Sequence, residues 1–99
     1  MLNITKSIEN GKAQFALSGR LDTTTAPELE QELKASLIGV GELVIDMKEL
    51  DYISSAGLRV LLSAQKVMNK QGSMTIKNAN DTILEIFEVT GFSDILTIE

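Results

Sequence analysis

Two neighbouring serines, Ser54 and Ser55, are the side chains in this 99-residue sequence best suited to chemistry. They are followed by Ala56 and Gly57, where a pattern typical of an apolar helix begins. A serine becomes a nucleophile when a base removes its proton, and residues 51–58 contain no histidine, lysine or glutamate. We therefore expect a hydroxyl that another protein modifies, rather than one that attacks a substrate.

A structural role explains at least one of these serines. Serine is favoured at helix N-caps because its oxygen accepts a hydrogen bond from an otherwise unpaired amide, which is worth about 1 kcal/mol. Since Ser54 and Ser55 compete for one cap, we predict that the helix starts at one of them. The other hydroxyl then lies in the first turn, where the helix dipole would favour an added phosphate by roughly 0.3 to 1 kcal/mol.

The composition removes most alternative chemistry. The chain has no cysteine, histidine or tryptophan, which excludes disulfides, thiolate nucleophiles, Cys/His zinc sites and imidazole acid–base catalysis. A net charge of −5 argues against nucleic acid as a partner. Apolar stretches are far shorter than the roughly 18 residues of a membrane span, and the N-terminus has no signal-peptide pattern. We expect a cytoplasmic protein that is not an enzyme and needs no metal or cofactor.

Two aspartates raise the possibility of a second kind of site, in which an aspartate accepts a phosphoryl group. Asp46 ends a predicted strand and Asp51 follows it, at the edge where open α/β sheets place their sites. A phospho-accepting aspartate of the receiver kind would also need carboxylates for a divalent ion and a lysine, roles open only to Asp22 and Lys77. The chain is short for that fold and begins with a hairpin, so we favour Asp46 as a cap for loop amides.

Two further segments fit structural roles. The glycines at 39 and 41 precede a strand, whereas a phosphate-binding loop needs glycines after one, so they indicate a turn. Residues 19–25 form a polar loop that leads from a strand into a capped helix, and turn chemistry explains its composition. If this loop lies beside Ser55, it forms the rim of a binding surface.

The elements that position these residues follow from periodicity. Apolar alternation on both sides of Asn10-Gly11 predicts an N-terminal hairpin. Thr25 and Glu28 suggest a capping box for a helix over 26–37, with Pro27 tolerated in its first turn. Residues 43–45 predict a central parallel strand buried on both faces, followed by a loop over 48–53.

The second half of the chain repeats this alternation. The helix from Ser54 or Ser55 should end at Gly72 in a left-handed cap, followed by a strand over 73–77. Asn80 or Asp81 should cap a third helix that Gly91 terminates, with a last short strand over 95–98. The predicted order is β β α β α β α β. This order indicates a single α/β domain over 1–99, with a mixed, mostly parallel sheet and three main helices.

Three motifs in sequence carry a family resemblance. Leu-Ser-Gly-Arg-Leu-Asp stands at 17–22, an apolar strand ends in Asp46, and Tyr-Ile-Ser-Ser-Ala-Gly-Leu stands at 52–58 before an apolar helix. In this order and at these spacings they resemble the STAS domain, in particular the bacterial anti-sigma factor antagonists. The resemblance spans the whole chain, and its fold agrees with the predicted element order.

The resemblance implies a partner-switching regulator. An unphosphorylated antagonist binds an anti-sigma factor that is also a serine kinase, and so frees the sigma factor. The kinase then phosphorylates the antagonist, the complex dissociates, and a PP2C-type phosphatase resets it. The acceptor is the residue two before the motif glycine, here Ser55. Many antagonists have Asp just before the acceptor, where this chain has Ser54, so Ser54 is the second candidate.

We expect a partner-binding surface around the acceptor, made of ten residues: Asp22, Thr23, Thr24, Asp51, Tyr52, Ile53, Ser54, Ala56, Gly57 and Arg59. Two other functions share the fold. One is a STAS scaffold or transporter-associated protein that does not switch. The other is a small-molecule module, such as a nucleotide binder, for which Tyr52 would be the only aromatic platform and Arg20 and Arg59 the only nearby cations.

Overall fold

The computed structural model describes all residues from 1 to 99. It contains nine elements in the order β1 Leu2–Glu9, β2 Lys12–Leu21, α1 Ala26–Ser36, β3 Glu42–Ile53, α2 Ser55–Gln71, β4 Ser73–Lys77, α3 Asp81–Val89, η1 Phe92–Asp94 and β5 Thr97–Ile98. Apart from the short 3-10 helix η1, this is the predicted order.

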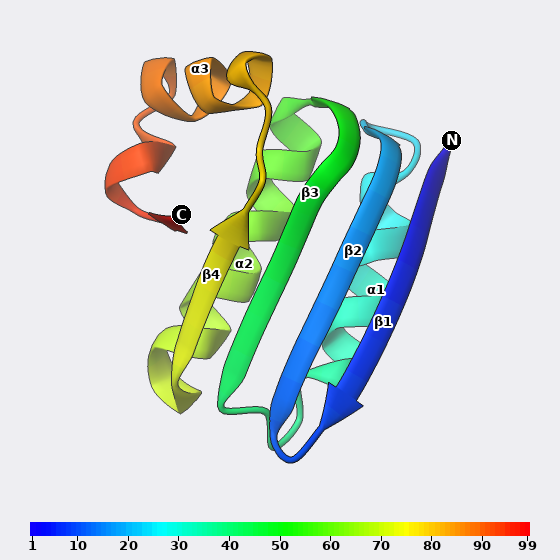
Figure 1. Ribbon diagram of the computed structural model, residues 1–99, viewed down its shortest axis with the longest axis vertical. Helices are drawn as coiled ribbons and strands as arrows, with labels where there is room; N and C mark the ends of the chain where they lie inside the picture. The colour runs from blue at the N-terminus through cyan, green and yellow to red at the C-terminus, as the bar shows by residue number, and fades with distance from the viewer.

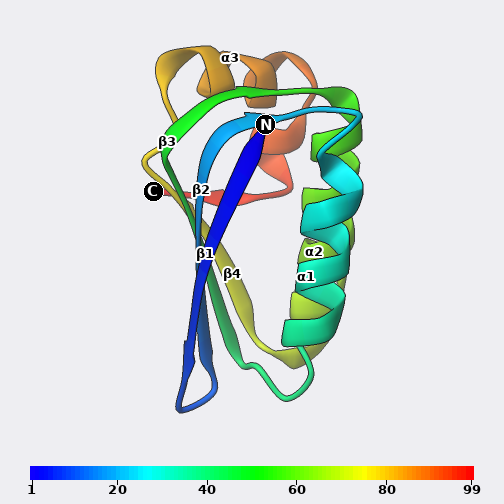
Figure 2. The same ribbon diagram turned by 90° about the vertical axis from the view of Figure 1, so that its right-hand side faces the viewer.

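The five strands form one mixed sheet in the order β1-β2-β3-β4-β5. Strands β1 and β2 are antiparallel, and the other neighbouring pairs are parallel. Helices α1 and α2 cover one face, and α3 lies beyond the carboxyl end of β4 (Figures 1 and 2). This arrangement confirms the predicted fold class. No helix is both long enough and apolar enough to cross a membrane.

The hairpin forms as the sequence predicts. Asn10 and Gly11 have φ values of 53° and 79°, the left-handed pair that a two-residue turn of type I′ requires. Beyond the turn, Ala13, Phe15 and Leu17 of β2 alternate inward and are almost completely buried. They pack under the helices, while the residues between them face the opposite, uncovered side of the sheet.

Strand β3 is longer than expected, and the loop predicted over 48–53 is wrong. The register between β2 and β3 shifts twice, and each shift places one extra residue in β3. Such β-bulges displace the alternation, so the buried side chains Met47, Leu50 and Ile53 recur every third residue. A search for period-two alternation therefore misses this half of the strand. The prediction that residues 43–45 form a central strand buried on both faces is confirmed, because Leu43, Val44 and Ile45 are all buried and β3 lies between the parallel strands β2 and β4. Both long helices nevertheless lie on one side of the sheet (Figure 2).

The helix ends differ from expectation at two positions. Thr25 is the N-cap residue of α1 but makes no side-chain cap hydrogen bond, so the predicted capping box with Glu28 is wrong. Gly72 ends α2 with φ 167°, which is extended rather than left-handed backbone. A Cβ at Gly72 would overlap the carbonyl oxygen of Gly41, so a close approach of two loops explains this glycine.

The third helix is capped as predicted. Asn80 accepts a hydrogen bond from the backbone amide of Ile83 at 2.8 Å. Gly91 has φ 81°, the left-handed conformation expected after the helix. Asn80 also donates from its amide to the carbonyl oxygen of Leu50 at 3.1 Å, which ties α3 to β3.

Candidate functional site

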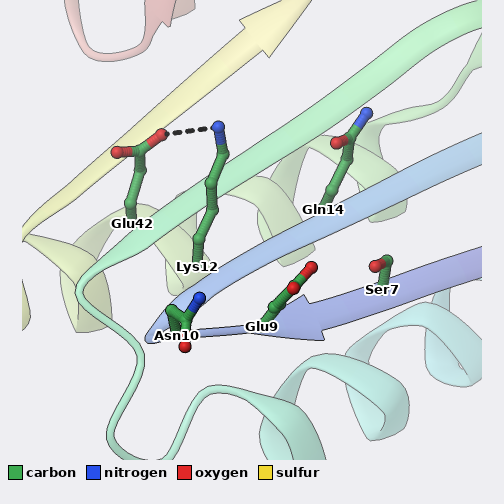
Figure 3. A pocket seen from close by; sticks show the side chains of 6 residues that line it. All are labelled: Ser7, Glu9, Asn10, Lys12, Gln14 and Glu42. Carbon is green, nitrogen blue, oxygen red and sulfur yellow. Dashed lines mark ion pairs between the residues drawn. The ribbon is translucent and has the colours of Figure 1, made fainter.

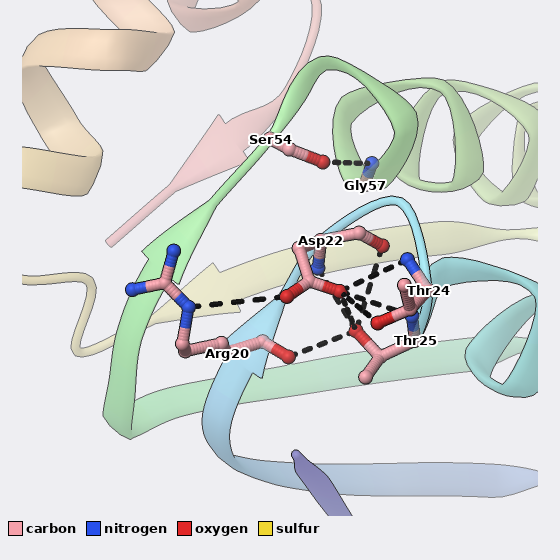
Figure 4. Close-up of polar contacts among 6 residues, drawn as sticks. All are labelled: Arg20, Asp22, Thr24, Thr25, Ser54 and Gly57. Carbon is pink, nitrogen blue, oxygen red and sulfur yellow. Dashed lines mark hydrogen bonds and ion pairs between the residues drawn. The ribbon is translucent and has the colours of Figure 1, made fainter.

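The two serines have different environments at the start of α2. Ser54 is the half-buried N-cap residue, and its Oγ accepts a hydrogen bond from the backbone amide of Gly57 at 3.5 Å (Figure 4). Ser55 is the first helical residue and is exposed. Its hydroxyl makes no hydrogen bond within the protein. The structure therefore separates a capping serine from one that is open to another molecule.

Gly57 holds this end of the helix against the sheet. A Cβ on Gly57 would lie 2.7 Å from Cγ of Leu21 and 2.9 Å from Cγ1 of Ile53. Side-chain carbons do not approach so closely, so any larger residue would push α2 outward. Gly57 thus allows the start of α2, and with it Ser55, to lie close to the ends of β2 and β3.

The loop after β2 is organised by Asp22. Its Oδ1 accepts hydrogen bonds from the hydroxyl and amide of Thr24 at 2.8 and 3.0 Å, and from the amide of Thr25 at 3.1 Å (Figure 4). These bonds, with the Thr24 hydroxyl first, lower the pKa of Asp22 below its ordinary value of 3.8. Asp22 is therefore ionised at neutral pH and adds a fixed negative charge.

Thr25 is the second anchor of this loop. Its hydroxyl accepts from the Asp22 amide at 2.9 Å and lies 2.9 Å from the carbonyl oxygen of Arg20. A hydroxyl with these partners is not free to cap α1, which explains why the capping box fails. The loop is thereby closed on itself, with Thr23 and Thr24 exposed at its tip.

A backbone hydrogen bond brings this loop to the start of α2, where the two serines lie. The amide of Ser54 donates to the carbonyl oxygen of Leu21 at 2.9 Å, which joins the end of β2 to the start of α2. A shallow depression lies between the first turns of α1 and α2. Three of the predicted partner-binding residues line it: Thr23, Ala56 and Arg59.

Helix α1 provides the other wall of this depression, which was not predicted from the sequence. Its residues are Ala26, Pro27 and Glu30, with Val60 of α2 completing the lining. Both helices follow strands of the same parallel pair and pack on the same face, so their N-termini lie side by side. That topology was the available signal, because nothing in the local sequence of α1 marks it as part of a site.

Tyr52 lies on a different surface from the serines. Leu21 of β2 and Ile53 of β3 are partners across the two strands, and both are buried. The preceding partners, Arg20 and Tyr52, therefore point to the uncovered face. The Arg20 guanidinium lies 4.5 Å from the centre of the Tyr52 ring, and its Nε is 3.8 Å from Oδ2 of Asp22. This cation–π contact covers a face of the ring and links Tyr52 to the Asp22 loop.

Two predicted partner-binding residues are inaccessible. Ile53 is 1% exposed and Gly57 is buried, so their role is to support the site from below. Asp51 is exposed on the irregular part of β3. The accessible members of the predicted set therefore belong to the Asp22 loop, to β3 at Asp51 and Tyr52, and to the first turns of α2.

Asp46 has the capping role that we favoured. Its Oδ1 accepts from the amide of Lys48 at 2.9 Å and from the side-chain amide of Asn78 at 3.1 Å. The Lys48 amide is the main cause of a pKa below the ordinary value of 3.8. No group of three or more acidic side chains is placed to hold a metal ion, so the receiver-type arrangement is not assembled.

The largest hollow of the molecule is far from the serines. It lies on the uncovered face near the hairpin, and its lining consists of Ser7, Glu9, Asn10, Lys12, Gln14 and Glu42 (Figure 3). Lys12 and Glu42 form an ion pair there at 3.4 Å. All six side chains are polar and all six residues are exposed, so this open hollow has no enclosed binding position.

The fold and the site together define a small α/β binding domain. A mixed sheet carries its helices on one face, and an exposed serine opens a helix beside an Asp-Thr loop. A comparison with models of protein families identifies the family. The model described as "Mlab, STAS domain" matches residues 4–97, so this chain belongs to the STAS-domain family.

Named relatives share this family over nearly the whole chain. BtrV of Bordetella bronchiseptica, a candidate anti-sigma factor antagonist, is 35% identical over 98% of this chain and 85% of its own length. The anti-sigma-B factor antagonist of Bacillus subtilis is 29% identical over 98% of this chain and 90% of its own. These relatives are named as antagonists rather than enzymes, in agreement with the expectation of a non-enzymatic protein.

Solved structures share the fold. An anti-sigma factor antagonist from Mycobacterium paratuberculosis superposes with a TM-score of 0.89 at 22% identity, covering 99% of this chain and 85% of the other. The Bacillus cell fate determinant SpoIIAA in its phosphorylated form gives 0.77 at 14% identity, covering 98% and 91%. The STAS fold expected from the motifs is confirmed.

Proposed function

We propose that this protein is an anti-sigma factor antagonist that works by partner switching in the cytoplasm. In its unphosphorylated form it binds an anti-sigma factor that is also a serine kinase, and so frees the sigma factor. Phosphorylation of Ser55 ends the binding, and a PP2C-type phosphatase restores it. The single observation that carries the proposal is the exposed, unbonded hydroxyl of Ser55 on the first turn of α2.

The local geometry favours Ser55 over Ser54 as the acceptor. The Ser54 oxygen already caps the amide of Gly57, and its residue is half-buried. A phosphoryl group on Ser54 would disturb that cap, which is worth about 1 kcal/mol. The Ser55 hydroxyl can be modified without breaking any hydrogen bond within the protein.

The chemical step needs nothing from this chain except the hydroxyl. The kinase transfers the γ-phosphoryl group of ATP to Oγ of Ser55, ADP leaves, and the hydroxyl proton passes to a base of the kinase. The phosphatase reverses the modification by hydrolysis, in which water supplies the oxygen that leaves with inorganic phosphate. Both reactions are catalysed by the partners, which agrees with the absence of a base beside the serines.

Electrostatics gives a reason for the complex to dissociate. A phosphoserine carries about −1.5 to −2 charges, so the net charge would change from −5 to roughly −7. The new charge would lie on the surface that also holds the ionised carboxylate of Asp22. An interface that covers Ser55 would have to desolvate this dianion, at a cost of several kcal/mol.

The two rival functions predict different surfaces. A nucleotide binder would use Tyr52 as its stacking platform, and Arg20 already covers one face of that ring. A STAS scaffold that does not switch would not depend on the Ser55 hydroxyl. The state of Ser55 therefore discriminates between scaffold and switch.

Paired affinity baits provide the test. Wild-type protein and Ser55→Asp are incubated with lysate of the source cells, and Ser63→Asp serves as the control because Ser63 is an exposed serine on the same helix. We expect an anti-sigma factor kinase to bind wild type and Ser63→Asp and to be lost from Ser55→Asp. The captured kinase should then phosphorylate Ser55, as mapped by mass spectrometry. Equal capture by all three baits, or phosphate at another residue, contradicts the proposal.

A further inference from the structure

Helix α2 differs in charge from the rest of this acidic protein. Its 17 residues include no aspartate or glutamate, while Arg59, Lys66 and Lys70 are all exposed along it. None of these three cations forms an ion pair. Of the other six cations, only Lys48 is unpaired, and the rest each pair with an acidic group: Lys6, Lys12, Arg20, Lys34 and Lys77. The helix therefore has uncommitted positive charge.

Arg59 is the one of these three cations that can reach Ser55. It follows Ser55 by four residues, the spacing at which side chains on a helix are neighbours. Helical side chains lean toward the N-terminus, so a long side chain at position 59 covers the turn that contains Ser55. Arg59 also lines the depression with Ala56 and Thr23, which places its side chain beside the first turn.

The surrounding acidic groups leave Arg59 available. Glu30 lines the same depression, but its carboxylate lies 4.0 Å from Lys34 on its own helix and within ion-pair distance of no other cation. Asp22 has its own cation in Arg20 and is held by the threonines of its loop. Arg59 thus has a carboxylate nearby without being bound by one.

We propose that Arg59 is the counter-ion of a phosphoryl group on Ser55, and that it holds this group against the first turn of α2. The inference rests on the proposed phosphorylation of Ser55 and adds the residue that receives the phosphate. An anion four residues before a cation is also the better orientation for an ion pair on a helix. A guanidinium suits the task because it can donate two parallel hydrogen bonds to phosphate oxygens.

This pairing gives the phosphorylated state a defined geometry. With Arg59 engaged, the phosphoryl group lies along α2 beside the depression between α1 and α2. The modification then changes two features of the surface at once, because it adds negative charge and removes the free cation at position 59. A partner that contacts Arg59 in the unmodified protein loses that contact, and this loss adds to the cost of desolvating the phosphate.

The test uses the full chain with phosphoserine incorporated at position 55 during synthesis, so no kinase is required. The second ionisation of the phosphate is followed by phosphorus NMR as a function of pH. A paired cation stabilises the dianion, so the pKa should be lower with Arg59 than in Arg59→Gln, by roughly 0.15 to 0.4 pH units. Arg59→Lys should retain part of the shift, and Lys66→Gln, almost two further turns along, should leave the pKa unchanged.

Two results would overturn the pairing. One is an identical phosphate pKa in the wild-type chain and in Arg59→Gln, with circular dichroism showing that both are folded. The other is an equal response to Lys66→Gln, which would indicate a general field rather than a specific contact. A kinase that fails to modify Ser55 would contradict the proposed function and would leave the titration result unaffected.

Discussion

Gly57 and Leu21 touch at the point where α2 meets the sheet, so that a Cβ on Gly57 would lie 2.7 Å from Cγ of Leu21. Gly57→Ala should therefore destabilise the protein by about 1 to 3 kcal/mol through overpacking. We expect this cost to outweigh the gain from the higher helix propensity of alanine. Urea unfolding measures this change. Ser63→Ala, at an exposed position of the same helix, is the control and should alter stability by less than about 0.5 kcal/mol. A Gly57→Ala protein as stable as wild type would show that the contact is loose.

The two serines should separate stability from modification. Ser54→Ala removes the cap on Gly57 and should lower the free energy of unfolding by about 1 kcal/mol, while phosphorylation at Ser55 continues. Ser55→Ala should change stability by less than about 0.5 kcal/mol and abolish phosphorylation. Denaturant unfolding and mass spectrometry measure the two effects. The reverse pattern would mean that the roles of the serines are exchanged.

The Thr24 hydroxyl should control the acidity of Asp22. In Thr24→Ala the pKa of Asp22 should rise toward its ordinary value of 3.8, because the largest stabilisation of the carboxylate is lost. Thr23→Ala is the matched control, since Thr23 is an exposed neighbour without a bond to Asp22. An NMR titration of the carboxyl carbons reads both variants. Equal Asp22 pKa values in wild type and Thr24→Ala would refute this assignment.

Asp22 should also make stability depend on pH. Its folded pKa lies below its unfolded value, so its contribution is present above about pH 3.8 and is lost as the pH falls through the lower, folded value. The difference in unfolding free energy between wild type and Asp22→Asn should therefore be constant near neutrality and shrink below pH 3.8. The comparison cancels the similar contribution of Asp46. A difference that grows on acidification would contradict the sign of the shift.

The Arg20–Tyr52 contact should be measurable as a coupling energy. A double-mutant cycle with Arg20→Met and Tyr52→Leu should give about 0.5 to 1 kcal/mol in unfolding free energy, the range of an exposed cation–π pair. Tyr52→Phe keeps the ring and should behave like wild type. A coupling energy indistinguishable from zero would mean that the stack does not hold the Asp22 loop in solution.

Local signals in the sequence were sufficient for the parts of the fold that local chemistry determines. Asn10-Gly11 specified the hairpin turn, and Ser54 and Gly57 located the start of α2 to within a residue. The carboxyl half of β3 could not be recognised, because two β-bulges break the alternation on which strand prediction depends. Bulges depend on how β3 pairs with β2, which one strand's sequence does not reveal.

In the candidate site, too, some residues could be found from the local sequence and others are brought together only by packing. The Ser54–Ser55 segment was found because two serines compete for one helix cap, and the Asp22 loop because it is a polar segment between a strand and a helix. The wall formed by Ala26, Pro27 and Glu30 was missed, since it exists only through the packing of α1 beside α2. The hydroxyl of Thr25 was assigned to a helix cap because the sequence does not show that the Asp22 loop takes it instead.

The presence or absence of a phosphoryl group on Ser55 is proposed to decide partner binding. The most direct measurement is the affinity of the purified anti-sigma factor kinase for the protein with serine and with phosphoserine at position 55, by isothermal titration calorimetry. We expect binding of the unmodified protein and at least a hundredfold weaker binding of the phosphorylated one, since a desolvation cost of about 3 kcal/mol corresponds to that ratio. Equal affinity of the two forms would contradict the account.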